Sequence, residues 1–390
     1  MPRFVKITKN PSTGEYDVDT NAMAGTAYQW GGDGRYLCSF LDIASSPDDT
    51  PTVLHNLRFN NNGTFEEEVL DTTGYTKVSN TEFTLMKPED LGNNWKSKLI
   101  SSGFTSVAAS STIAVAVGEG TKIWTTTDGE TWTDRSTTDI GKMNGVAYAE
   151  DKGLFVAVGN YKCITSSDGI NWSTSPELPQ SANSITYVPS LGKFLVACSY
   201  GYVLSSSDGV SWTSVSTGIS AQLKGIAYSD TLGKYVVVGH GDWDSYLLTS
   251  SDFTTWTQQT VSVPTNGKLK SVCYSDELNM FVAVGPIDTI ITSTDGDTWS
   301  IVDLDVPSGQ YYASVIYSNL LHAFYIVGGS QVKSSDGVNW ESNYSSGNNT
   351  YLDVVCDFKN LLIGCSSSGL YSSDGIVTYQ RVEGSEFTLW

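Results

Sequence analysis

The chain has 390 residues, a formal net charge of −20 and only 16% charged residues. Such an acidic balance argues against a nucleic-acid or anionic-membrane partner, because clustered Lys and Arg side chains bind both. No run approaches 18 apolar residues and the first residues lack the apolar region of a signal peptide, which predicts synthesis in a cytoplasm without membrane insertion. Abundant Gly, Ser, Thr and aromatic residues are typical of short strands joined by tight turns.

Residues 1–88 contain no internal repeat and are predicted to form a small β-rich N-terminal domain. Short runs of β-branched and aromatic residues separated by Gly, Pro, Asn and Asp predict its strands. These runs are 4–8, 15–18, 36–41, 52–59, 65–70 and 82–86. We expect this domain to anchor the protein.

Residues 89–390 carry a recurring signature, Ser/Thr-x-Asp-Gly-x-x-Trp. Its aspartates are Asp128, Asp168, Asp208, Asp252, Asp295, Asp336 and Asp374. Consecutive copies lie about 40 residues apart, which is the length of one propeller blade. In the fifth copy, short apolar runs at 271–274, 280–284, 289–293 and 298–302 predict a four-stranded antiparallel meander, with strands A to D from the axis outward. The sequence therefore predicts an all-β, seven-bladed β-propeller.

The signature is expected to form the turn between strands C and D, and we call it the signature turn. The aspartate can accept hydrogen bonds from turn amides, the glycine supplies a positive φ, and the tryptophan packs under the turn. These tryptophans are Trp132, Trp172, Trp212, Trp256, Trp299 and Trp340. Two copies depart from the pattern, because Phe253 replaces the glycine in blade four and Thr378 replaces the tryptophan in blade seven.

The segments TTTDGETW, TSSDGINW and SSSDGVSW resemble the Asp-box (BNR) repeats of sialidases, sortilin-type receptors, photosystem assembly propellers and phage tail proteins. This resemblance implies the propeller scaffold and says little about activity. The acidic, Ser/Thr/Asn/Gly-rich chain with its leading domain resembles bacteriophage tail and virion-associated propellers. That second resemblance implies a non-enzymatic virion protein, whose N-terminal domain docks on other virion proteins or sister subunits and whose propeller binds a host-surface glycan or protein.

A closed ring must join its last blade to its first. Residues 92–95 repeat the Gly-x-x-Trp half of the signature, so 95–100 is a candidate outer strand for blade seven. The alternative is that 378–382 supplies this strand.

The candidate recognition face carries the loops between strands B and C and those between strands D and A. The signature turns lie on the opposite face, which assigns them a structural role. The predicted ligand-binding residues are Tyr161, Tyr200, His240, Asp242, Trp243, Asp244, Tyr311, Tyr312 and Tyr351. Aromatic rings beside carboxylates suit carbohydrate binding, because rings stack on C–H faces and carboxylates accept hydroxyl hydrogens. The alternative is that several of these tyrosines pack between blades.

Other polar residues of the D to A connections are Lys142, Gln222, Lys224, Lys268, Lys270 and Gln310. His240, Asp242 and Asp244 are interpreted as polar loop residues rather than metal ligands, and no cofactor is predicted. The six scattered cysteines form no CxxC pair and are predicted to be free and buried.

The sequence supports an enzymatic function less well than a binding function. A sialidase holds its substrate carboxylate with three arginines, and the propeller has only Arg135 and Arg381. A two-carboxylate glycan hydrolase could draw on Glu119, Asp242, Asp244 and Asp288, but the separation of the pair decides that chemistry. An assembly factor that binds a partner protein is the remaining alternative.

Overall fold

The computed structural model describes residues 103–137, 140–242, 244–260, 263, 267–304, 310–341, 352–359 and 361–373, together with Lys98 and the backbone of strands outside these ranges. The chain divides into two compact units, Met1–Asp90 with Gly375–Trp390, and Leu91–Asp374. Within the described residues, no helix is long and apolar enough to span a bilayer.

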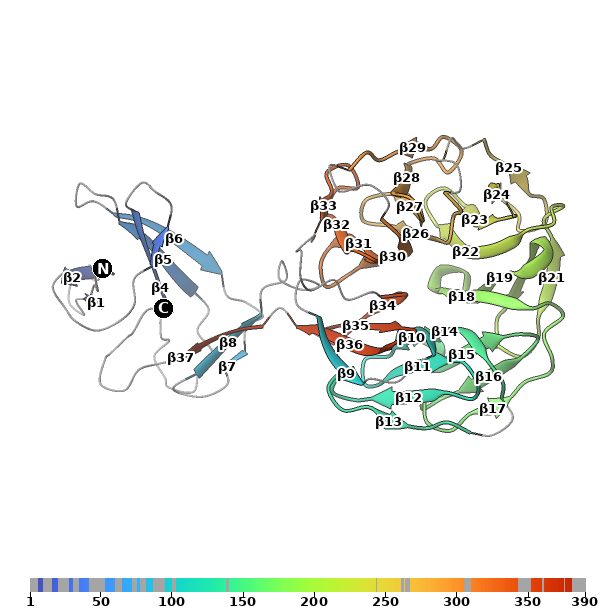
Figure 1. Ribbon diagram of the computed structural model, residues 1–390, viewed down its shortest axis with the longest axis horizontal. Helices are drawn as coiled ribbons and strands as arrows, with labels where there is room; N and C mark the ends of the chain where they lie inside the picture. The colour runs from blue at the N-terminus through green and yellow to red at the C-terminus, as the bar shows by residue number, and fades with distance from the viewer. Residues whose placement is uncertain are drawn as a thin grey trace. The chain divides into compact units, whose positions relative to one another are not determined.

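The second unit is a seven-bladed propeller whose blades are four-stranded antiparallel sheets, as the sequence predicts (Figure 1). Blades one to three comprise β10 (Phe104–Ala109), β11 (Ala114–Gly118), β12 (Ile123–Thr126) and β13 (Thr133–Asp134); β14 (Met143–Ala149), β15 (Leu154–Gly159), β16 (Cys163–Ser166) and β17 (Ser173–Thr174); and β18 (Ala182–Val188), β19 (Lys193–Cys198), β20 (Tyr202–Ser206) and β21 (Thr213–Ser216). Blades four to six comprise β22 (Gln222–Ser229), β23 (Lys234–His240), β24 (Ser245–Ser250) and β25 (Thr257–Gln258); β26 (Ser271–Ser275), β27 (Met280–Gly285), β28 (Thr289–Ser293) and β29 (Ser300–Ile301); and β30 (Tyr312–Ser318), β31 (Ala323–Gly328), β32 (Val332–Ser334) and β33 (Glu341–Ser342). Short 3-10 turns occur at Glu150–Lys152, Pro189–Leu191 and Ser199–Gly201.

Blade seven closes the ring with a strand from the beginning of the propeller. It contains β34 (Val354–Phe358), β35 (Leu361–Ser366) and β36 (Gly369–Asp374), and β36 pairs with β9 (Trp95–Leu99). The predicted closure by 95–100 is thus confirmed. The alternative strand is wrong, because β37 (Ile376–Gln380) pairs with β8 (Glu82–Met86) in a different sheet.

The first unit is described only through its strand backbones. They are β1 (Lys6–Lys9), β2 (Tyr16–Asp19), β3 (Tyr28–Trp30), β4 (Arg35–Leu41), β5 (Val53–Phe59), β6 (Phe65–Asp71), β7 (Thr76–Lys77), β8 and β37. The first two form a hairpin, β3 to β6 form a four-stranded antiparallel sheet, and β37 and β7 flank β8. These strand backbones do not test the predicted anchoring role of this region.

The core of the propeller lies between neighbouring blades. The second strand of each blade contains an apolar run, and β11 (Ala114–Gly118) is buried along its whole length. One apolar cluster joins Val115 and Val117 of blade one to Met143 and Phe155 of blade two. Because both faces of each B strand meet another blade, the sequence needs no polar alternation there. Fully buried aliphatic and aromatic side chains contribute about 1.5 to 3 kcal/mol each.

The cysteines follow this packing. Cys163, Cys198, Cys273, Cys356 and Cys365 are free thiols, three of them buried and Cys273 and Cys356 half-buried, while Cys38 lies outside the described side chains. Burial raises the pKa of the Cys163 thiol to about 11, so this thiol stays protonated.

The signature turn owes its shape to paired side-chain caps. In blade three, the Asp208 Oδ1 atom accepts hydrogen bonds from the amides of Val210 and Ser211 at 2.8 and 2.7 Å. The Ser206 hydroxyl accepts from the Gly209 amide at 2.9 Å and donates to Asp208. The same bonds to the aspartate recur in all six signature turns whose side chains are described, from Asp128 to Asp336, whereas the Asp374 side chain lies outside the described residues.

Each signature turn also packs against the preceding blade. Gly209 has a φ of +72°, and a Cβ built there would lie 2.6 Å from Cγ2 of Val156 in blade two. The Cys163 thiol of blade two donates to the Gly209 carbonyl at 3.2 Å. In four of the turns the tryptophan indole donates to the carbonyl of the turn glycine or of Phe253, as Trp172 does to Gly169 at 3.0 Å. The signature therefore joins blades as well as strands.

Phe253 adopts the left-handed conformation of the turn glycines, although a phenylalanine disfavours a positive φ. Its φ is +66°, and Asp252 makes the same pair of amide bonds as its counterparts. The ring is buried and packs against Tyr235 and Trp256, with centroids 5.1 and 5.9 Å away. The blade thus replaces glycine with a residue whose packing offsets backbone strain.

We expect Phe253→Gly to lower the free energy of unfolding by about 2 kcal/mol, because loss of a buried Phe side chain costs about 3 to 5 kcal/mol and relief of the left-handed strain returns about 1 to 2. Phe253→Ala should be more destabilising than Phe253→Gly, since alanine loses the packing and keeps the strain. Equilibrium urea unfolding of both variants measures the difference. Equal stability of the two would show that the positive φ carries no strain.

Candidate functional site

In five of the seven blades, the inner strand opens with one extra residue, a β-bulge, at the mouth of the central channel. The ladder shifts register around Thr105, Asn144, Asn183, Lys224 and Ala313. Lys270 and Asp353 occupy the same place in blades five and seven, directly before the paired residues Ser271 and Val354. A bulge re-aims the side chain that it inserts. The seven positions therefore form one ring, which we call the bulge ring.

In blades one to three the bulge ring links neighbouring blades. Thr105 Oγ1 donates to the Met143 carbonyl at 2.6 Å. Asn144 and Asn183 donate their side-chain amides to the carbonyls of Ala182 and Leu223, at 2.7 and 2.8 Å. Each bond runs from one blade to the next, so these short polar side chains hold the mouth of the channel together.

In blades four and five the ring carries lysines instead. The Lys270 ammonium donates to the Tyr311 hydroxyl and lies 4.7 Å from the centroid of the Tyr311 ring, a cation–π contact. Lys224 is half-buried at the neighbouring position. Lys270 thus keeps a link to the next blade through Tyr311, whereas Lys224 makes none among the described residues, and two cationic side chains lie on one side of the ring.

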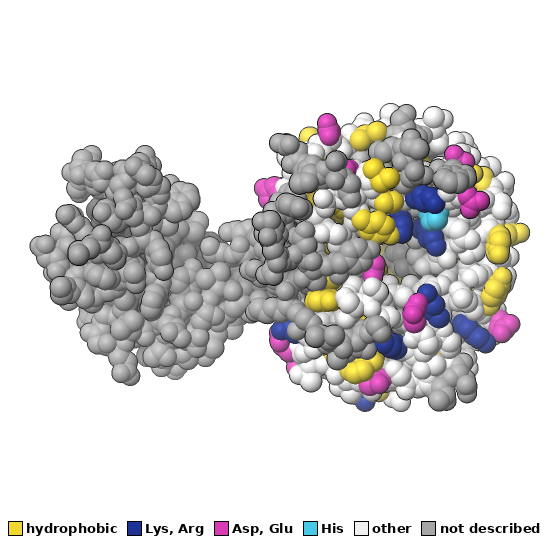
Figure 2. Space-filling model, in the orientation of Figure 1, with side chains coloured by type: hydrophobic (Ala, Val, Ile, Leu, Met, Phe, Trp, Pro, Cys, Tyr) yellow, Lys and Arg dark blue, Asp and Glu magenta, His cyan; other side chains and the backbone are white. Residues whose placement is uncertain are grey.

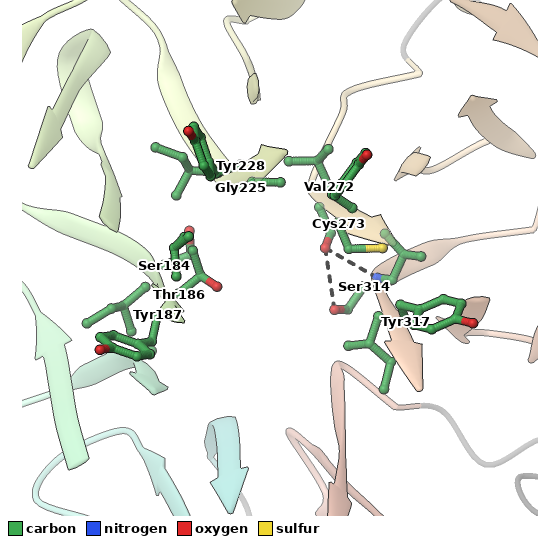
Figure 3. A pocket seen from close by; sticks show the side chains of 18 of the residues that line it. Ser184, Thr186, Tyr187, Gly225, Tyr228, Val272, Cys273, Ser314 and Tyr317 are labelled. Atoms are coloured by element: carbon green, nitrogen blue, oxygen red, sulfur yellow. Dashed lines mark hydrogen bonds between the residues drawn. The ribbon is translucent and has the colours of Figure 1, made fainter. Parts of the chain in front are cut away.

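Two connected hollows follow the axis of the propeller. The channel has a volume of about 960 Å³ and is lined by the inner strands, with Ser184, Thr186, Cys273 and Ser314 around its open centre (Figure 3). The hollow at the mouth has a volume of about 760 Å³ and is lined by residues that include Glu119, Tyr311 and Asp353. Lys224 and Lys270 line both hollows. Volumes of this size are those of small-molecule sites.

Basic side chains gather beside a histidine at the edge of the central hollow (Figure 2). His240 is half-buried, and one of its ring nitrogens lies 3.0 Å from the Gly241 carbonyl oxygen. Burial lowers the pKa of His240, and the nearby charges of Lys224, Lys268 and Lys270 lower it further. The imidazole is therefore neutral at pH 7.

The turns between strands B and C present exposed side chains in strained backbone. Tyr161 has a φ of +57° and Tyr200 a φ of +60°, and their side chains are 44% and 61% exposed. Ile287 in blade five has a φ of +58° and is 41% exposed. Non-glycine residues in this region carry strain that the surrounding structure must offset, and such residues cluster at binding sites.

The predicted ligand-binding residues differ in how exposed the structure leaves them. Tyr161, Tyr200, Asp242 and Asp244 are exposed, and His240 and Tyr311 are half-buried. Tyr312 requires a correction, because its side chain is fully buried in the core between blades five and six and cannot stack on a ligand. Trp243 and Tyr351 lie outside the described residues.

The predicted carboxylates are engaged in different ways. Glu119 Oε1 lies 3.1 Å from Lys142 Nζ. Asp288 Oδ1 accepts a hydrogen bond from the backbone amide of Gln310 at 2.7 Å, and this bond links blade five to the connection that enters blade six. Asp242 and Asp244 are exposed in the loop that begins at His240, and among the described residues no group of three or more His, Cys, Asp and Glu side chains is placed to hold a metal ion.

The sequence of a single blade identifies Lys224 and Lys270 as polar loop residues but does not place them in the bulge ring. Aligning the repeats on the strand that follows shows that the two lysines occupy equivalent positions. The segments MNGVAYA, ANSITYV, LKGIAYS and LKSVCYS place Asn, Asn, Lys and Lys in one column. Only the bulge shows that this column faces the mouth.

Residues 251–386 match the family profile described as "DUF6242 beta propeller domain". No curated protein matches the chain significantly. Solved structures with similar folds include virginiamycin B lyase from Staphylococcus aureus, with 9% identity, a TM-score of 0.59 and coverage of 72% of this chain and 98% of that one. A streptogramin B lyase has 10% identity, a TM-score of 0.59 and coverage of 74% and 98%. The WD40 propeller domain of Doa1 has 11% identity, a TM-score of 0.56 and coverage of 74% and 97%.

At these identities the likeness extends to the fold alone. The propeller architecture is thus shared with lyases and with WD40 proteins, and the function of this chain has to be argued from its own site.

Proposed function

We propose that this chain is a non-enzymatic recognition protein of the phage tail-fibre, adhesin or decoration type. In this proposal the N-terminal β-rich region docks on the particle, and the loop face around the channel mouth binds a host-surface glycan or protein. The Asp-box likeness of the signature turns, the acidic composition and the order of the two regions support it.

The observation that carries the binding half of the proposal is the pair of exposed tyrosines at the B to C turns. Tyr161 and Tyr200 belong to adjacent blades and occupy equivalent turns on the face that bears the channel mouth. Their rings are more exposed than those of the inner-strand tyrosines, such as Tyr148, whose ring packs against Phe155 at a tilt, with centroids 4.4 Å apart. Rigid, amphipathic rings held in fixed turns suit carbohydrate stacking, because little side-chain entropy is lost on binding.

We expect Tyr161→Ala and Tyr200→Ala each to weaken binding to a captured polysaccharide by roughly tenfold, since one stacked aromatic ring contributes about 0.5 to 1.5 kcal/mol beyond its buried area. The measurement is retention of the purified protein on immobilised neutral and acidic host-surface polysaccharides. Val338→Ala is the matched control, because Val338 is 70% exposed and lies in a signature turn on the opposite face. Unchanged retention in both tyrosine variants, or release of cleaved saccharide, would contradict this proposal.

The docking half has a separate test. Density for this chain on purified virions, contacting the particle through residues 1–88, is the expected result. Absence of the chain from purified virions would exclude the virion setting and leave the binding face to be explained by another partner.

A further inference from the structure

The bulge ring changes its chemistry at blades four and five. The first three positions hold neutral side chains that bond to the next blade. The next two hold lysines: within the described residues Lys224 makes no such bond, and the Lys270 ammonium donates to Tyr311 at the start of blade six. A repeat that needs only a link between blades has no reason to place two ammonium groups side by side at a channel mouth. The positive charge at both positions and the missing link at Lys224 point to a role other than holding the ring together.

Lys224 is a half-buried cation, and the neighbouring charges that act on its pKa are those of other lysines. Within the described part of the chain it makes no hydrogen bond and no ion pair. Burial lowers the pKa of its ammonium group, and the positive charges of Lys270 and Lys142 lower it further. A buried charge without a partner is costly unless an ion of opposite sign compensates it. A bound anion would supply that compensation.

The acidic groups of the mouth are already engaged. Glu119 pairs with Lys142 at 3.1 Å, and Asp353 Oδ2 accepts the Ser367 amide at 3.0 Å. The Coulombic neighbours of His240 are Lys224, Lys268 and Lys270. In a chain with a net charge of −20, this basic side of the mouth is a local reversal of the prevailing charge. Such a reversal steers and selects an anionic ligand.

We propose that Lys224 and Lys270 bind the carboxylate of an acidic saccharide at the mouth of the channel. This inference rests on the proposed function and deepens it by naming the ligand class. The Tyr311 ring, held beside Lys270 in the same hollow, supplies aromatic surface for a sugar ring. A carboxylate on a sugar satisfies the cations and the aromatic surfaces together, whereas a free small carboxylate engages the lysines alone.

The test is calorimetric titration of the full chain with three probes. Oligogalacturonate presents carboxylates on a saccharide, its methyl ester presents the same rings without charge, and citrate presents carboxylates without a sugar. We expect oligogalacturonate to bind about tenfold more tightly than either other probe, and to bind more weakly as ionic strength rises. Lys224→Gln and Lys270→Gln should each weaken this binding by about tenfold, while Lys224→Arg should retain it.

Lys193→Gln is the charge-matched control, since Lys193 is exposed and begins β19 on the face opposite the mouth. Circular dichroism of each variant establishes that it is folded. Citrate binding as tightly as oligogalacturonate would overturn the saccharide assignment. Equal binding of oligogalacturonate to the wild type and to Lys224→Gln would overturn the inference while leaving a recognition face intact. No binding of any probe would also overturn it, and the retention experiment on Tyr161 and Tyr200 then decides the proposed function by itself.

Discussion

Replacement of Gly209 by alanine is expected to lower the free energy of unfolding by about 2 to 5 kcal/mol. A left-handed backbone costs an alanine about 1 to 2 kcal/mol, and overpacking adds about 1 to 3. The new methyl group would lie 2.6 Å from the Val156 side chain, which is fully buried and stiff because it is β-branched. The blade two to blade three contact therefore has to shift. Equilibrium urea unfolding measures the loss.

Gly218→Ala separates the two causes. Gly218 has a φ of +85°, and a Cβ added there meets nothing within 4 Å. Its substitution should cost only the backbone strain, about 1 to 2 kcal/mol. If the two alanine variants lose the same stability, the close approach between blades has no energetic weight, and the turn glycine is present for its backbone alone.

Acidification is expected to unfold the propeller through its signature turns. Hydrogen bonds from turn amides lower the pKa of Asp128, Asp208 and Asp295 to about 2, from an ordinary value of 3.8. The carboxylates are ionised in the folded state at a pH where the unfolded chain binds protons. The stabilisation is therefore complete above about pH 4 and is lost as the pH falls through about 2. Asp357, whose pKa burial raises, acts in the opposite sense.

Urea unfolding followed from pH 5 to pH 2 measures this loss. Asp208→Asn should be less stable than the wild type at neutral pH and should decline less steeply in acid, because one titrating turn is gone while an acceptor oxygen remains. Asp128→Asn makes the same change in blade one and should give a similar reduction in slope. A variant that keeps the full acid dependence of the wild type would show that these turns do not govern it.

The fold could be predicted because a propeller repeats its local chemistry. The spacing of the aspartates defines the blade length, and residues 92–95 identify the strand that closes the ring. The outer strand of blade five was predicted too long, since 298–302 contains only the two-residue strand β29. An outermost strand has one neighbour and an exposed face, so its residue types constrain its length weakly.

The candidate site was harder to predict because of the bulges. A period of two assigns side chains to faces only while the register is unbroken, and an inserted residue exchanges the faces. Tyr311 and Tyr312 precede the bulge at Ala313, and one is half-buried at the mouth while the other is in the core. The same shift gives Lys224 its position. Phe253 shows a further limit, because tertiary packing keeps a backbone conformation that residue preference alone disfavours.

The closure of blade seven by β9 has a consequence for biosynthesis. The strand β9 leaves the ribosome before blade one, and its partner β36 ends at Asp374, so the last sheet cannot form until the chain has been made as far as Asp374. Until then, β9 has no partner and blade one lacks the neighbour that covers its other side. Exposed edges and apolar faces of this kind favour association between nascent chains. Because the ring closes only when β36 pairs with β9, we expect aggregation of this protein to occur mainly before closure.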